Sequence, residues 1–130
     1  MTYLTYSIGD LVIRIKNGYM AKRESVSAPY SRVNEAVVKK LAQLQFISDY
    51  HVDKEKKLLD IRLRYDDGRP ALTDLRLFST PGRRWYVSYR TLKPVLSGYG
   101  FSLLSSPKGI VTNIEAKKLK VGGELLFNIW

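Results

Sequence analysis

The chain has 130 residues and a mass of 14.9 kDa, and its 22 lysines and arginines against 12 aspartates and glutamates give a formal charge of +10. A hydrophobic fraction of 45% supports a core, which excludes a disordered basic tail and predicts one domain or two very small ones. Cysteine is absent, which excludes disulfide scaffolds, thiolate zinc sites and cysteine nucleophiles.

Two amphipathic helices are predicted in the first third of the chain, over residues 8–19 and 33–44, because apolar side chains recur at helical spacing in both. Ser7 lies three residues before Asp10 and offers a capping-box start for the first helix, which the polar residues 21–24 then end. A start signal, Pro-Tyr-Ser, precedes the second helix.

From Phe46 onward the hydrophobic period changes to two, most clearly over residues 59–65, which indicates a half-buried strand. Residues 66–71 are rich in turn formers and charge, and they mark a junction. We therefore predict two small domains, residues 1–68 and residues 69–130.

The C-terminal domain is predicted to consist of short elements separated by turns. Strands are expected over residues 72–78, 84–89, 101–104, 110–111 and 125–129, with a turn at 80–82, a short helix or turn over 92–96 and a loop over 105–109. Thr112 and Glu115 form a second capping box, which opens a helix that runs through Lys120 and stops at Gly122 and Gly123. The predicted class is α+β, with an N-terminal helix-and-strand domain packed on a mostly β C-terminal domain with short helices.

The positive charge belongs mostly to the C-terminal part, since residues 1–75 carry a net charge of +3 and residues 76–130 a net charge of +7. Such a field attracts nucleic acid or an anionic membrane, although a solubilising charge excess is the alternative. Membrane binding is disfavoured, because the basic residues lie on short strands and loops. No membrane span or secretory signal is evident, so a cytoplasmic location is expected.

Motifs for catalysis and for metal binding are weak. Ser105 and Lys108 have the spacing of the serine–lysine pair of penicillin-binding proteins and class A β-lactamases, but the second motif of those enzymes is absent. His51 is the single histidine, and Asp66 and Asp67 are typical turn formers, so we expect neither a metal nor a cofactor. We predict no enzyme activity, and a serine–lysine hydrolase is the least favoured alternative.

A nucleic-acid site is indicated more strongly. Arg83 and Arg84 stand beside Trp85 and Tyr86, and this combination can hold phosphates and stack on a base or sugar. Because side chains alternate along a strand, about half of these four are expected to touch a ligand and one ring is expected to face the core. Residues 105–109, Ser-Ser-Pro-Lys-Gly, offer hydroxyl groups and a cation that suit a shallow RNA groove, although serine-rich turns are also common without a function.

Three C-terminal segments together resemble the family of bacterial small-subunit ribosomal protein number eight. They are residues 79–87 (STPGRRWYV), residues 98–112 (Gly-Tyr-Gly through SSPKGIVT) and residues 115–130 (EAKK and VGGE up to Trp130), and residues 10–18 and 29–32 extend the resemblance to the N-terminal part. The resemblance implies a two-domain protein that binds the central domain of small-subunit ribosomal RNA early in assembly. It implies neighbouring small-subunit proteins, such as protein five, as partners, and in several bacteria relatives also bind their own messenger RNA and repress its translation.

The resemblance transfers the family's RNA contacts to Tyr86, Ser105, Ser106, Pro107, Lys108, Gly122, Gly123 and Glu124. The family loop commonly reads Ser-Thr-Ser-Lys-Gly, so Pro107 removes a hydroxyl group and a backbone N–H from it. Glu124 is expected to accept a hydrogen bond from a base amino group, a 2′-hydroxyl or the serine loop, while Lys108, Arg83 and Arg84 supply affinity.

Arg14, Lys16 and Asn17 lie off the apolar face of the first helix, where they either meet a second RNA segment or form a solvated face. The combined hypothesis is a structural protein of the small ribosomal subunit, in the cytoplasm or in an organelle. A free-standing repressor of its own messenger RNA is the alternative.

Overall fold

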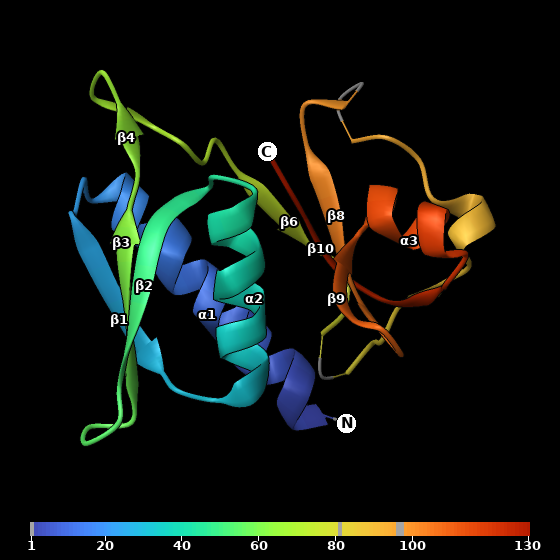
Figure 1. The fold of residues 1–130 in the computed structure, drawn as a ribbon, viewed down its shortest axis with the longest axis horizontal. Coiled ribbons are helices and arrows are strands. Elements are labelled where there is room, and N and C mark those ends of the chain that lie inside the picture. The colour runs from blue at the N-terminus through green and yellow to red at the C-terminus, as the bar shows by residue number, and fades with distance from the viewer. Residues whose placement is uncertain (1, 81, 96–97) are drawn as a thin grey trace. The chain divides into compact units, whose positions relative to one another are not determined.

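The computed structural model describes residues 2–80, 82–95 and 98–130 (Figure 1). Contacts between residues group the chain into two compact units, residues 7–73 and residues 74–130, the latter together with the first six residues. Three α-helices and several antiparallel sheets within the described residues confirm the predicted α+β class. The predicted junction at residues 66–71 forms a two-stranded hairpin within the first unit, and the domain boundary between residues 68 and 69 stays a prediction.

In the unit of residues 7–73, two helices lie on one side of a three-stranded antiparallel sheet of order β1-β3-β2 (Figure 1). The elements are α1 (Thr2–Met20), β1 (Ser25–Pro29), α2 (Arg32–Gln43), β2 (Ile47–Asp53), β3 (Leu58–Leu63), β4 (Tyr65–Asp66) and β5 (Arg69–Pro70). The central strand β3 buries Leu59, Ile61 and Leu63 and exposes the residues between them, as the period of two predicts. The Ser31 hydroxyl accepts a hydrogen bond from the Asn34 N–H, which confirms the predicted start of α2.

One expectation about this unit is wrong, and strand β1 was not predicted. Helix α1 begins at Thr2, so Ser7 lies inside the helix, where its hydroxyl donates to Asn34 Oδ1 at 3.0 Å instead of capping the helix. The segment before Ser7 contains neither glycine nor proline, so nothing in it stops the helix. Strand β1 was not predicted, because its small and polar sequence SVSAP has little strand propensity, and it forms through its pairing with β3.

The buried side chain of Tyr19 joins the end of α1 to the sheet. Its hydroxyl donates to the Phe46 carbonyl and accepts from the Arg64 N–H at 3.0 Å, and its ring lies edge-on to Tyr65 with centroids 5.4 Å apart. Burial raises the pKa of Tyr19 above the usual 10.0. One phenol thus ties together three segments that are distant in sequence.

In the unit of residues 74–130, a four-stranded antiparallel path has the order β6-β10-β8-β9, with β7 also paired to β10 and α3 packed beside β8 and β9 (Figure 1). The elements are β6 (Leu75–Leu77), β7 (Tyr86–Val87), a 3₁₀ turn η1 (Tyr89–Thr91), β8 (Phe101–Ser106), β9 (Gly109–Thr112), α3 (Asn113–Leu119) and β10 (Gly123–Ile129). The central strand β10 is buried on both faces from Glu124 to Phe127, with a shift in register between Leu125 and Phe127. The simple alternation expected for this strand is therefore wrong, because the bulge turns an extra residue into the interior.

The caps and turns of this unit differ in part from expectation. The capping box of α3 is confirmed, since Thr112 Oγ1 accepts from the Glu115 N–H at 3.1 Å and Glu115 Oε1 accepts from the Thr112 N–H at 3.0 Å. The helix ends at Leu119, with Lys120 as a left-handed cap, and not at Gly122.

Several expected segments have different lengths or forms. The strand expected over residues 84–89 shortens to Tyr86–Val87, and a single 3₁₀ turn follows at Tyr89–Thr91, earlier than the helix or turn expected at 92–96. The expected loop at 105–109 is the tight end of the β8–β9 hairpin. Parts of the turn at 80–82 and of the segment 92–96 lie outside the described residues.

Replacing Tyr19 with phenylalanine is expected to lower the free energy of unfolding by about 1–3 kcal/mol, because the change removes both hydrogen bonds of a buried hydroxyl. The raised pKa means that the folded state keeps this proton after the unfolded chain has lost it, so wild-type stability falls as the pH rises above 10.0. Urea denaturation at neutral and at alkaline pH measures both effects, and the variant should show the shallower alkaline slope. Tyr99→Phe, at a side chain that is 85% exposed, is the control, and equal losses in the two variants would contradict the prediction.

Candidate nucleic-acid interface

Three neighbouring strands bring Tyr86, Glu124 and Ser105 into one row across the end of the C-terminal sheet. Glu124 of β10 pairs with Tyr86 of β7 on one side and with Ser105 of β8 on the other. Side chains of directly paired residues lie on the same face of a sheet. Tyr86 is 65% exposed and Glu124 is 6% exposed, so a buried carboxylate lies between an open phenol ring and a serine hydroxyl. We call these three residues the interface row.

The backbone of Gly122 and Gly123 makes this row possible. A Cβ atom on Gly123 would lie 2.2 Å from the Ser105 carbonyl oxygen, and one on Gly122 would lie 2.5 Å from the Val87 carbonyl oxygen. Both distances are too short for any side chain, so only glycine lets β10 enter between β7 and β8. Gly122 and Gly123, which the resemblance predicts as RNA contacts, thus have a structural role: they let β10 pair with both β7 and β8.

The β8–β9 hairpin next to the row carries the predicted serine–lysine segment. The Ser106 hydroxyl donates to the Gly109 carbonyl at 2.9 Å and accepts from the Lys108 N–H at 3.1 Å, so it braces the turn. Proline in the first central position and glycine last are typical of a type I turn, and Gly109 has a φ of +101°. Pro107 therefore fits the turn, and Lys108 is exposed at its tip.

Ser105 and Ser106 differ in what their hydroxyl groups do. Within the described part of the chain, the Ser105 hydroxyl has no hydrogen-bond partner, whereas the Ser106 hydroxyl is used twice. The side chain of Ser105 is half-buried beside Glu124 and can still donate to a ligand. The sequence alone predicts the same role for both serines, and only the hydrogen bonds in the structure distinguish them.

The arginine and aromatic segment lies on the other side of the row. Arg83 is exposed, with its guanidinium carbon 5.6 Å from the centroid of the Trp85 ring, and Arg84 is half-buried. Trp85 is 39% exposed and meets Phe78 edge-on at 5.4 Å, so neither Trp85 nor Tyr86 is a core residue. The expectation that one of the two rings faces the core is wrong, because the strand here is only two residues long and lies at the margin of the sheet.

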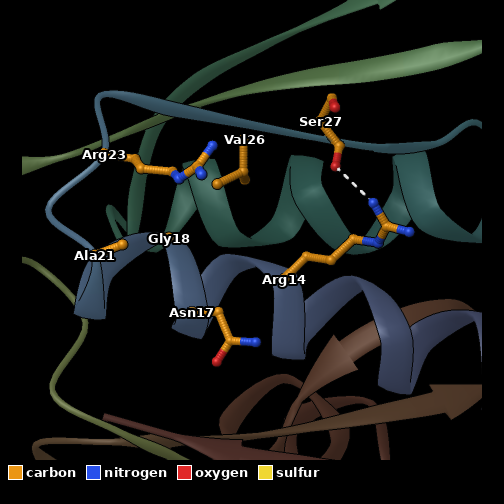
Figure 2. Close-up of a pocket in the computed structure, with 7 residues that line it drawn as sticks. All are labelled: Arg14, Asn17, Gly18, Ala21, Arg23, Val26 and Ser27. Carbon is orange, nitrogen blue, oxygen red and sulfur yellow. Dashed lines mark hydrogen bonds between the residues drawn. The ribbon is translucent and has the colours of Figure 1, made fainter.

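The three candidate residues of the first helix belong to the other unit. Figure 2 shows Arg14 and Asn17 of α1 lining a hollow of about 380 Å³ under β1, together with Arg23. Arg14 Nη1 donates to the Ser27 carbonyl at 3.3 Å, and Arg14 Nε pairs with Asp10 at 2.9 Å. Sequence reasoning missed Arg23, because it read residues 21–24 only as the end of the helix.

The described residues bear on two of the alternatives, a metal site and a serine–lysine pair. No group of three or more histidine, aspartate or glutamate side chains within them could hold a metal ion, and no hydrogen bond joins Ser105 to Lys108 in this part of the chain. None of the described helices is long and apolar enough to cross a membrane. The candidate interface consists of exposed aromatic rings, hydroxyl groups and cations around one carboxylate.

The chain is similar over nearly its whole length to known proteins of one family. The model of the ribosomal protein S8 family matches residues 7–130 of the chain. Small ribosomal subunit protein uS8 of Mycoplasmopsis synoviae is 40% identical over 131 residues, which cover 98% of this chain and 99% of that protein. The proteins of the same name from Borrelia turicatae and Mesorhizobium japonicum are 37% and 39% identical over 130 residues, with 98% of each chain covered.

Replacing Gly123 with alanine is expected to lower the free energy of unfolding by about 1–3 kcal/mol or more, because the added methyl group meets the Ser105 carbonyl and must push β10 away from β8. Urea denaturation measures the loss. Gly82→Ala is the matched control, since a Cβ there has no atom within 4 Å. Unchanged stability of the Gly123 variant would show that the strands do not approach as closely as described.

Proposed function

The chain belongs to the ribosomal protein S8 family, and from this premise we propose that it is a structural constituent of the small ribosomal subunit that binds the central domain of small-subunit ribosomal RNA during assembly. The observation that carries the RNA-binding proposal is the interface row, in which an exposed ring, a buried carboxylate and an available hydroxyl share one face. The relatives named above are small-subunit proteins, which supports the ribosomal part.

Each member of the row supplies a different contact to RNA. Tyr86 presents an open ring for stacking on a base or a ribose. Ser105 donates a hydrogen bond from its hydroxyl, and Glu124 accepts one from a base amino group or a 2′-hydroxyl. Because a carboxylate repels phosphate, Glu124 contacts hydrogen-bond donors at a groove edge and not the sugar–phosphate backbone.

Cations around the row supply affinity. Lys108 at the hairpin tip and Arg83 and Arg84 beside Tyr86 contact phosphates on either side of the row. Pro107 has no long side chain that would keep RNA away from the hairpin, and Gly122 and Gly123 contribute by letting β10 carry Glu124 between Tyr86 and Ser105. Ser106 contributes indirectly by holding the turn that carries Lys108.

Residues of α1 and neighbouring proteins provide the other proposed contacts in the assembled subunit. Arg14, Lys16 and Asn17 on α1 meet a second RNA segment. Arg14 donates to the Ser27 carbonyl of β1 (Figure 2) and pairs with Asp10 one turn earlier on α1. Neighbouring small-subunit proteins, protein five among them, are the protein partners, and the site of action is the cytoplasmic ribosome. Density-gradient fractionation tests this location, since a free-standing repressor of its own messenger RNA would sediment away from ribosomes.

Ser105→Ala is expected to weaken binding to a central-domain RNA fragment by about 1–3 kcal/mol and to leave binding to an unrelated duplex unchanged, because it removes one donor to a groove edge. The variant should fold normally, since no described residue bonds to this hydroxyl. Calorimetric titration with both RNAs measures the difference, and Ser25→Ala on the exposed start of β1 is the control. Equal losses of affinity for the two RNAs would contradict specific recognition of the central-domain RNA by the interface row.

Lys108→Gln is expected to reduce the salt dependence of binding, by about 0.7–0.9 in the slope of log K against log salt for each phosphate that the variant no longer neutralises. The ammonium group is exposed at the hairpin tip, where it can reach phosphate without desolvation of the protein. A binding series from low to high salt gives the slope. Lys56→Gln, an exposed lysine of the other unit, is the control, and an unchanged slope for the Lys108 variant would remove this residue from the interface.

A further inference from the structure

A groove of about 640 Å³ lies on the face of the C-terminal sheet opposite to the interface row, within the size range of roughly 300–1,000 Å³ of small-ligand sites. Ser102 lines the groove, and it is three residues from Ser105 on the regular strand β8, so their side chains lie on opposite faces. The residues that carry the argument are Arg76, Phe78, Trp85, Lys93, Asn128 and Trp130.

Aromatic rings form the walls of this groove, and both tryptophans of the chain line it. Trp85 meets Phe78 edge-on at 5.4 Å, has the guanidinium carbon of Arg83 5.6 Å from its ring centroid, and keeps 39% of its surface exposed. The guanidinium carbon of Arg76 lies 5.1 Å from the Phe78 centroid, which holds this cation over the aromatic wall. An indole that lines a concave surface and remains open to solvent is suited to stacking on a flat ring.

The polar groups of the groove are donors. Ser102 Oγ donates to Asn128 Oδ1 at 2.6 Å, which leaves the two N–H groups of the Asn128 amide for a ligand, since no described residue accepts from them. Arg76 and Lys93 are exposed at the groove, and none of its lining residues is acidic. A ligand that is complementary to this groove has a flat ring, hydrogen-bond acceptors and negative charge.

We propose that this groove binds an unpaired nucleotide of single-stranded RNA. The base stacks on Trp85, Asn128 donates to an acceptor on the base edge, and Arg76 and Lys93 hold the flanking phosphates. An acidic peptide would satisfy the two cations but would leave the open indole and the amide donors without a matching group. The site rests on the proposed function and extends it, because it gives the chain a further RNA contact on the opposite face of the same sheet.

The test uses the full chain and a fluorescein-labelled oligoadenylate of five residues, which forms no duplex. Binding is expected to be saturable by fluorescence anisotropy and to quench the tryptophan emission, since both tryptophans line the groove. Trp85→Leu is expected to weaken binding about tenfold, the size typical of removing one stacking ring. Arg76→Gln and Lys93→Gln keep both fluorophores and are expected to weaken binding and reduce quenching, and Lys118→Gln on α3, outside the groove, is the matched control for charge.

The outcomes separate this proposal from the proposed function. Absence of oligoadenylate binding in a chain that still binds the central-domain RNA would overturn the groove and leave the ribosomal assignment standing, whereas failure to bind either RNA would overturn both. Equal weakening by Lys93→Gln and Lys118→Gln would mean that net charge alone attracts the strand. Quenching by an acidic pentapeptide at lower concentration than by the oligoadenylate would make the groove a protein-docking surface instead.

Discussion

The close approach of three backbones at Gly122 and Gly123 is the constraint on which the C-terminal unit depends. Because neither position has room for a Cβ atom, β10 enters between β7 and β8 and pairs with both. This pairing places the Glu124 carboxylate between Tyr86 and Ser105, and it buries a charged residue that would otherwise face solvent. Gly122 and Gly123, which lie beyond the end of α3, therefore set the geometry of the proposed RNA-binding surface.

The two faces of one sheet serve different proposed contacts, and the alternation of side chains separates them. Ser105 on one face belongs to the interface row, while Ser102 on the other holds Asn128 at the floor of the aromatic groove. Trp85 and Tyr86 are adjacent in sequence, yet Trp85 lines the groove and Tyr86 stands in the row. Short strands at the margin of a sheet thus present both of their faces to ligands.

In the N-terminal unit, single side chains connect elements that are distant in sequence. Tyr19 connects α1 with the segments around Phe46 and Arg64, and Ser7 connects the same helix with Asn34 of α2. These contacts hold α1 against its sheet, so Arg14 and Asn17 have fixed positions along the hollow shown in Figure 2.

The sequence by itself determined the α+β class, the capped start of α2, the capping box of α3 and the strand period of β3, because each of these signals acts within a few neighbouring residues. The C-terminal motifs also carried the family resemblance, which named Tyr86, residues 105–108 and Glu124 as candidates. The existence of β1 and the bulge in β10 were decided only by the tertiary structure. The different tasks of Ser105 and Ser106 and the burial of Glu124 likewise depend on strands paired across long sequence separations, and no local pattern encodes which backbone will lie beside which.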